Sequence, residues 1–453
     1  AYERSAAGIP VTVLEKSDHV GGMASSMQVG DWTVDHGPHR FHTRNRELMD
    51  HYRLILDGDT HVRHRLSRIH MKGKFFNYPL KASNVLANLP PHILVKALID
   101  YAVIRTRNRF RPIPDDNFRN WVPKRFGKTI AELFFVTYTE KAWGVPATEI
   151  SADWASQRIT LLNLWDTVKK SLRPREGGAK NRTLITQFEY PASGRGIGTI
   201  SENYAKRITA QGGRILTGAA VKELRVENGR VTTVIHDGEG GPLRPDLVVN
   251  TAPLPKLIEY MRPVAPREVM DSIGEMTYVA IHFVYLEVDR PKLTDDHWIY
   301  LPEKHLTIHR ISEMKNFDPT MGPPDKTVIC CEITCPPDGE IWNWTAEQAA
   351  EAAERDLVDA GLLTPGECRP VHTTRLRYAY PIYDLGYREH LRRLLDHVEG
   401  IENLHTTGRQ GLFRYNNMDH SVAMGRHIAK GVIGKADIEG HAEVAAEDDL
   451  FEN

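Results

Sequence analysis

The feature that most restricts the fold of this chain is a short segment near its start, where a helical pattern, a glycine stop and an apolar strand follow one another. The alanine-rich stretch 1–7 has helical character, Gly8 occupies the position after a helix end, and Pro10 prevents continuation. The β-branched run 11–14 has the character of a strand and closes on Glu15. This order is that of the second half of a βαβ unit, so the segment predicts a nucleotide-binding α/β fold.

Two features beside this strand bear on a bound nucleotide. In such a unit the acid that ends the second strand accepts hydrogen bonds from ribose hydroxyls, although Glu15 alone could equally be an exposed strand-end acid. Gly21 and Gly22 let the backbone approach a phosphate or cofactor without a Cβ, although alone they could form an ordinary turn. The combined pattern E-x5-G-G is more specific than either part. We expect the G-x-G-x-x-G loop that opens the first helix of such a unit to precede Ala1 and to lie outside this sequence.

Further along, stretches with helical spacing alternate with stretches of strand character. Apolar residues recur at helical spacing through 85–104 and 130–143. After about residue 195 short β-branched runs predominate, and Asn228-Gly229 carries the signal of a tight hairpin. We also expect strands at 214–217, 220–226, 231–235, 247–249, 403–408 and within 277–335, and helices at 198–210, 346–362 and 421–431.

The βα segments are separated by one helical block and one strand block, which predicts an α/β fold with α+β insertions. We therefore predict a discontinuous Rossmann-like domain that carries a mainly helical insertion and a substrate domain built on an antiparallel sheet. The nucleotide-binding domain takes residues 1–72, 195–275 and 400–435, the helical insertion 73–194, the sheet-rich domain 276–399, and an acidic tail 436–453.

The charge and hydropathy of the chain limit the classes of partner that it is expected to bind. The formal net charge of −1 creates no global field that would attract nucleic acid or an anionic membrane, although local basic patches remain possible. The longest apolar stretch, 92–104, is interrupted by Lys96 and Asp100, so we expect no membrane span.

The cysteines and histidines do not form a metal-binding pattern. Three of the four cysteines lie in one predicted strand, TVICCEITC, without a C-x-x-C pair or nearby histidines, which favours buried thiols and a cytoplasmic location. His36, His39 and His42 could bind a metal on a suitable turn, but Gly37-Pro38 argues against a single helical face. We therefore expect no metal site.

Six further segments follow E-x5-G-G in the order in which they occur in one enzyme family. With them the chain resembles UDP-galactopyranose mutases, a branch of the FAD-dependent amine oxidase and protoporphyrinogen oxidase superfamily. The resemblance implies an FAD-binding domain of the glutathione-reductase type. The segments are DHGPHRFHT at 35–43, GKFFNYPL at 73–80, YTEKAWG at 138–144, HRIS at 309–312, YAYPI at 378–382 and GRQGLFRYNNMD at 408–419.

The resemblance also implies roles around the cofactor. The segment 37–39 would pack beside the isoalloxazine, Arg409 would meet the FAD diphosphate, and the helix opened by 417–419 would aim its N-terminus at the N1–C2 edge of the flavin. The residues expected to bind FAD are Glu15, Gly21, Gly22, Gly37, Pro38, Val221, Gly408, Arg409, Asn417, Met418 and Asp419.

For the substrate, the resemblance implies that Arg158 and Arg310 hold the diphosphate of a nucleotide sugar, although surface ion pairing is the commoner role of an arginine. With His39 they form the expected catalytic set. The aromatic residues Trp143, Tyr380 and Tyr415 would line the substrate pocket or, without the resemblance, belong to the core.

Three positions depart from the mutase pattern. Ile333 replaces a substrate-binding tyrosine, no tyrosine-bearing segment is recognisable in 159–165, and Asn416-Asn417 replaces a pair that usually contains Asp.

Two enzymatic hypotheses follow from the resemblance. In the first, N5 of reduced FAD attacks the anomeric carbon of a nucleotide sugar, and ring opening and reclosure convert pyranose to furanose, with an external reductant such as NAD(P)H. In the second, the same cofactor serves an oxidoreductase of the amine oxidase or protoporphyrinogen oxidase type. A third possibility is a binding protein that has lost its flavin.

Overall fold

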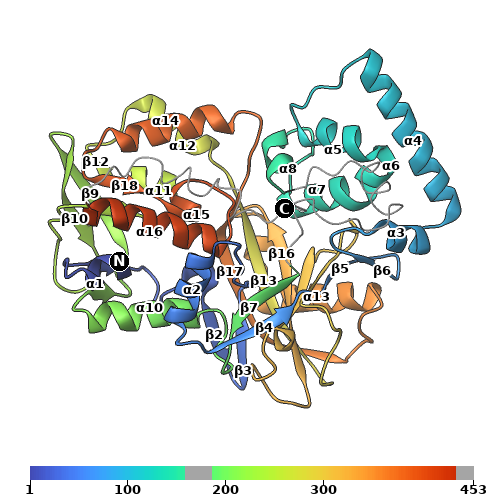
Figure 1. Cartoon of the computed structure of the whole chain (residues 1–453), viewed down its shortest axis with the longest axis horizontal. Coiled ribbons are helices and arrows are strands. Elements are labelled where there is room, and N and C mark those ends of the chain that lie inside the picture. Colours follow the sequence, from blue (N-terminus) through green and yellow to red (C-terminus); the bar gives the residue numbers. More distant parts are fainter. Residues whose placement is uncertain (159–185, 435–453) are drawn as a thin grey trace.

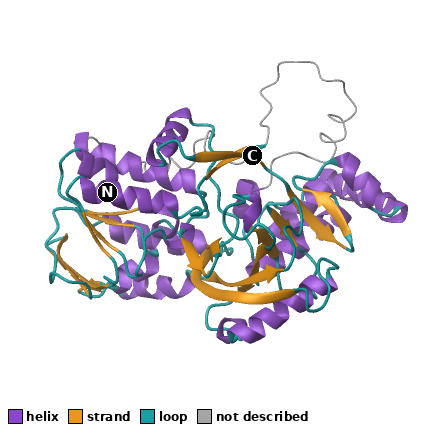
Figure 2. Cartoon of the chain, turned by 90° about the horizontal axis from the view of Figure 1, so that it is seen from below, coloured by secondary structure: helices purple, strands orange, loops and turns teal. Residues whose placement is uncertain are grey.

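The computed structural model describes residues 1–158 and 186–434. Figure 1 shows helices and short strands on the left, a sheet of long strands in the lower centre, and a helical group at the upper right. In the view from below, the long strands lie in the centre of the molecule with helices to either side (Figure 2). The fold is thus a mixed α/β architecture, as predicted.

The first group is built on two parallel strand pairs that join distant parts of the sequence. Strand β1 (Thr12–Leu14) pairs with β8 (Arg214–Leu216), and β11 (Val248–Asn250) pairs with β18 (Leu404–Thr406). Around them lie η1 (Gly22–Ala24) and the helices α1 (Tyr2–Ala6), α2 (Arg46–Ile55), α10 (Thr199–Ala210), α11 (Leu254–Glu259), α12 (Arg267–Glu275), α14 (Tyr387–Glu399), α15 (Gly408–Gly411) and α16 (Met418–Gly434).

A small three-stranded sheet, β10-β9-β12, completes this group. Its strands are β9 (Val221–Glu227), β10 (Arg230–His236) and β12 (Met261–Arg262). Asn228 and Gly229 join β9 to β10 with φ of 53° and 72°, the two left-handed conformations that a tight hairpin turn needs. The hairpin signal in the sequence is therefore confirmed.

The central sheet has seven strands in the order β17-β13-β16-β15-β14-β5-β6. We predicted an antiparallel sheet within 276–399, and the described strand pairs of that range are antiparallel. The parallel pair of the sheet joins β14 to β5, which lies outside that range. The turn between β5 and β6 contains the predicted domain boundary at residues 72 and 73. The strands are β17 (Cys368–Pro381), β13 (Tyr278–Val288), β16 (Thr327–Cys335), β15 (Arg310–Glu313), β14 (Trp298–Tyr300), β5 (Ser67–Met71) and β6 (Lys74–Asn77).

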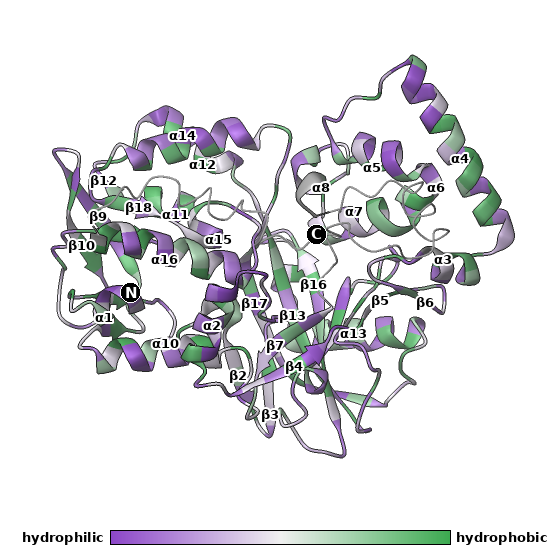
Figure 3. Ribbon diagram, in the orientation of Figure 1, coloured by the Kyte–Doolittle hydropathy of each residue, from purple (hydrophilic) through white to green (hydrophobic). Residues whose placement is uncertain are grey.

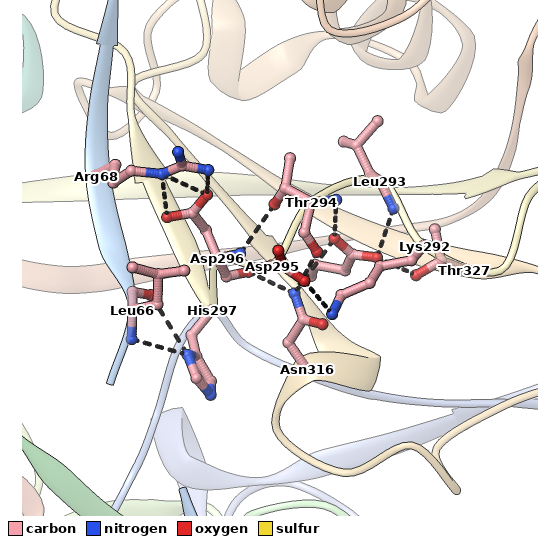
Figure 4. A network of polar contacts seen from close by, with 11 residues as sticks. Leu66, Arg68, Lys292, Leu293, Thr294, Asp295, Asp296, His297, Asn316 and Thr327 are labelled. Atoms are coloured by element: carbon pink, nitrogen blue, oxygen red, sulfur yellow. Dashed lines mark hydrogen bonds and ion pairs between the residues drawn. The ribbon is translucent and has the colours of Figure 1, made fainter. Parts of the chain in front are cut away.

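One face of this sheet packs on α13 (Ala346–Asp359), which starts with a capping box formed by Thr345 and Gln348. The segment between β13 and β14 is fixed by polar contacts: the Glu313 carboxylate accepts from the backbone N–H groups of Leu293 and Thr294, both at 2.8 Å (Figure 4). Two antiparallel strand pairs flank the sheet. They are β2 (Ser26–Val29) with β3 (Trp32–Asp35), and β4 (Thr60–His64) with β7 (Gln187–Pro191).

The helical group forms the third part. The helical stretch 128–143 is interrupted by a π-helical segment. It ends at Gly144, whose φ of 68° is left-handed. Among the described residues, no helix combines the length and apolar character needed to cross a bilayer. The elements are α3 (Ala82–Asn88), α4 (Pro91–Phe110), α5 (Phe118–Phe126), α6 (Lys128–Ala131), η2 (Glu132–Val136), α7 (Thr137–Trp143) and α8 (Ala152–Arg158).

Candidate active site

The candidate site lies on the face of the central sheet opposite α13. Strand register places Arg310 directly beside Tyr300 on one side and Glu332 on the other, so the three side chains share this face. The loop after β3 lies against them. A Cβ built on Gly37, whose φ is 82°, would lie 3.0 Å from the Glu332 Oε1 atom, so the close approach of loop and sheet requires glycine here.

Arg310 and Glu332 form a buried ion pair. The Arg310 Nε and Nη2 atoms each donate to a different Glu332 carboxylate oxygen at 2.6 Å, and Nη2 also donates to the Tyr380 hydroxyl at 3.1 Å. The side chains are 16% and 1% exposed. Although burial opposes its charge, the neighbouring Glu332 carboxylate raises the pKa of Arg310 well above its ordinary value, so the guanidinium is permanently charged.

Aromatic rings from four segments surround this pair. Trp143, the last residue of α7, stacks on Tyr380 with centroids 5.6 Å apart, and Tyr415 lies 5.3 Å from Tyr380. The ring of Trp154 in α8 meets the ring of Trp143 edge-on, with centroids 4.4 Å apart. The predicted aromatic residues therefore do lie together, next to Arg310.

Arg409 brings a second guanidinium to the same cluster. Its Nη1 donates to the Asn416 carbonyl at 2.7 Å and its Nη2 to the Ala379 carbonyl at 2.9 Å. The guanidinium carbon lies 4.3 Å from the ring centroid of Tyr415 and 5.3 Å from that of Tyr380. Arg310 and Arg409 thus contact the same tyrosine, one at its hydroxyl and one at its ring.

The turn at Gly21-Gly22 is joined to the segment that carries Arg409. Gly21 and Gly22 have φ of 110° and 54°, and a Cβ on Gly21 would lie within 3.1 Å of Ser201. The Met23 sulfur accepts from the Gln410 amide at 3.4 Å, which joins this turn to α15.

The other residues expected at the cofactor lie along the same half of the molecule. The half-buried Glu15 directly follows β1 and accepts from the backbone N–H of Ser17 at 2.8 Å. Gly408 opens α15, and Met418 opens α16, where Asp419 is buried. Val221 opens β9.

Arg158, the other half of the predicted clamp, is the last residue of α8. Its side chain lies outside the described residues, as does the segment 159–165. The structure therefore does not test whether Arg158 faces Arg310.

Several buried polar atoms in this region lack a hydrogen-bond partner within the described part of the chain. They are His39 Nδ1, Trp143 Nε1, Thr407 Oγ1, Gln410 Oε1 and Asn416 Oδ1. A buried polar group without a partner is costly, so atoms of this kind indicate where a polar ligand binds. Their position around the Gly37 loop and the α15 turn fits a cofactor with nitrogen and oxygen atoms along one edge.

His39 has the protonation state of a buried imidazole. Burial lowers the pKa of His39 to about 3, and the positive charges of Arg409 and Arg310 act in the same direction. The ring is therefore neutral near pH 7. Within the described residues, no group of three or more His, Cys, Asp or Glu side chains is arranged to hold a metal ion.

Two residues of the site were not predicted. Glu332 could not be identified from local sequence, because its pairing with Arg310 depends on the register between β15 and β16. Lys141 lies in the predicted 138–144 segment without an assigned role; its Nζ donates to the carbonyls of Leu301, Glu303 and Ile308 at 2.7, 2.9 and 2.6 Å. It thereby ties α7 to the segment that leads into β15.

Ile333 itself points away from the site. It belongs to the core between the sheet and α13, together with Val284 and Cys331. The departure at this position therefore does not alter the cluster around Tyr380.

Comparison with known proteins agrees with this arrangement. The family described as flavin containing amine oxidoreductase matches residues 1–413. The chain belongs to this family. Flavin amine oxidoreductases depend on FAD, so both the predicted superfamily and the predicted cofactor are confirmed.

Solved structures show the same fold at low sequence identity. A reduced UDP-galactopyranose mutase matches with a TM-score of 0.82 at 20% identity over 98% of this chain and 96% of that one. A putative protoporphyrinogen oxidase from Exiguobacterium sp. 255-15 gives 0.68 at 16% identity over 96% and 94%. A putrescine oxidase mutant gives 0.64 at 14% identity over 96% and 96%.

Proposed function

We propose that this flavin amine oxidoreductase family member is a nucleotide-sugar mutase, which interconverts pyranose and furanose forms of a sugar bound to a nucleoside diphosphate. The observation that carries the proposal is the pair of guanidinium groups on Tyr380. Two permanent cations beside stacked aromatic rings suit two anionic ligands that meet at one place, FAD and a nucleotide sugar. The likeness in fold to a UDP-galactopyranose mutase supports the same conclusion.

The residues present fit FAD, because buried donors and acceptors without partners in the described structure surround the Gly37 loop and the α15 turn. Glu15, the Gly21-Gly22 turn and Arg409 would hold the adenosine and diphosphate portions. Bound in its reduced form, the flavin supplies a nucleophilic nitrogen, N5, for the anomeric carbon of the sugar.

Arg310 binds the substrate diphosphate in this proposal. Glu332 occupies its Nε and Nη2 edge, and the two Nη1 donors have no hydrogen-bond partner in the described residues, so they are available to a phosphate oxygen. Trp143 and Tyr415 offer ring faces to the sugar or base, and the Tyr380 hydroxyl holds the guanidinium in place. His39, neutral near pH 7, can accept or donate one hydrogen bond without adding charge.

An oxidoreductase is the second candidate, favoured by the match to the amine oxidoreductase family itself. The two functions differ in electron balance. A mutase needs a reduced flavin and consumes no reductant per turnover, whereas an oxidase or dehydrogenase substrate bleaches the oxidised flavin.

The test is to reduce the purified FAD-bound protein with dithionite, add UDP-galactopyranose and other nucleotide hexoses, and follow furanose formation by chromatography. We expect conversion without loss of reductant, and Arg310→Ala should abolish it while flavin content stays unchanged. Arg68→Ala is the matched control, because Arg68 also binds a buried carboxylate, that of Asp296 (Figure 4). Strand register places Arg68 on the opposite face of the sheet from Arg310. Turnover by Arg310→Ala, or bleaching of oxidised flavin by an amine with no mutase activity, would refute the proposal.

A further inference from the structure

Helix α4 presents large apolar side chains to solvent. Its inner side packs on α5 and α6, and the helix lies at the outer edge of the molecule (Figure 1). Figure 3 shows hydrophobic colour along this helix. We call the exposed row the outer stripe. It consists of Val95, Leu98, Ile99 and Val103, which are 56–65% exposed, and Phe110, which is 77% exposed.

Basic residues border the outer stripe on both sides. At 3.6 residues per turn, Lys96 and Arg107 follow one border and Arg105 the other, whereas Arg109 lies within the row near Phe110. All four basic residues are exposed. None of the four forms an ion pair with a carboxylate in the described residues. The single acid of the helix, Asp100, is turned inward, where its carboxylate accepts from the Thr129 hydroxyl at 2.5 Å.

We propose that α4 is a membrane-docking helix, which lies flat on an anionic phospholipid bilayer with the outer stripe in the interface and its arginines and lysine at the phosphate groups. The outer stripe runs from Val95 to Phe110, so at 1.5 Å per residue the row is about 23 Å long. Exposed apolar side chains flanked by cations suit the surface of an anionic bilayer, because each cation near that surface is attracted to the lipid phosphates. The attraction is local, because the whole chain has a formal net charge of −1.

The charges favour a bilayer over a second copy of this chain. A two-fold symmetric dimer brings the same patch of each subunit together, so the borders of two outer stripes would set cations against cations. The cores of protein interfaces are also depleted of charged residues, and no acid on the outer side of α4 could compensate.

The experiment is co-sedimentation of the FAD-bound protein with vesicles of phosphatidylcholine alone or with 30% phosphatidylglycerol. We expect binding to the anionic vesicles, little binding to phosphatidylcholine alone, and weakening in high salt. Arg105→Glu/Arg109→Glu should reduce the partition coefficient by about fivefold or more per charge. Leu98→Glu/Val103→Glu should reduce it at least as strongly.

The matched control is Val264→Glu/Leu385→Glu, which changes two apolar residues of 59% and 60% exposure outside α4 and should bind vesicles like the unchanged protein. Flavin absorbance and circular dichroism establish that each variant is folded. Absence of binding to anionic vesicles, or equal loss in the control, overturns the proposal. So does a dimer in light scattering that Leu98→Glu/Val103→Glu dissociates while vesicle binding is unaffected.

Discussion

The buried pair of Arg310 and Glu332 allows a quantitative prediction. Removal of one member leaves the other charge buried and uncompensated, which costs about 3–5 kcal/mol of folding free energy. The cost of Glu332→Gln should lie at the lower end of this range. The Tyr380 hydroxyl still contacts Arg310 at 3.1 Å, and the new amide oxygen can accept one hydrogen bond. The cost of Arg310→Met should lie at the upper end, because it leaves the Glu332 carboxylate, which is 1% exposed, without its ion-pair partner.

The double variant Arg310→Met/Glu332→Gln contains neither charge. Its cost should therefore be well below the sum of the two single costs, with an interaction free energy of about 3 kcal/mol or more. The assay is urea-induced unfolding followed by circular dichroism at a fixed FAD concentration, since cofactor binding itself adds to the measured stability. Additivity of the single costs to within about 0.5 kcal/mol would refute the pairing.

The cost of Glu332→Gln also has an expected response to pH. In Glu332→Gln the guanidinium cannot lose its charge, so the cost should not change between pH 5 and 8. Arg68→Met is the control: it should lower stability without altering the flavin absorption spectrum.

Two other predictions concern the segment from β3 to the Gly37 loop. Burial raises the pKa of Asp35 to about 6, so the folded state binds a proton that the unfolded chain has lost between about pH 4 and 6. Stability should therefore fall by about 3 kcal/mol over this range, and Asp35→Asn should remove the dependence in unfolding curves at each pH. Gly37→Ala should weaken FAD binding at least tenfold in flavin fluorescence titrations, because a side chain at φ 82° would contact Glu332; unchanged affinity would place the flavin elsewhere.

Local patterns predicted much of the fold. The strand before Glu15, the Asn228-Gly229 turn and the helix at 198–210 depend on neighbouring residues alone, and each is present. The resemblance selected Trp143, Tyr380, Tyr415, Arg310 and Arg409, and the structure brings these five together, although their roles stay predictions.

Long-range pairing could not be predicted in the same way. The parallel contact of β14 with β5 joins residues about 230 positions apart, and no local pattern specifies it. Glu332 looked like any strand residue, because only the register of β16 against β15 places its carboxylate on Arg310. The unpartnered atoms around α15 likewise depend on how three distant segments pack.

The pairing of β11 with β18 has a consequence for how the protein is made. Leu404 must leave the ribosome before Val248 can pair with it, so β11 and β18 join only after the helical group and the central sheet have been synthesised. Until then one edge of β11 lacks its partner and is open to wrong association. Cofactor capture is therefore a late event in biogenesis, and nascent chains released before residue 404 should accumulate as aggregates without flavin.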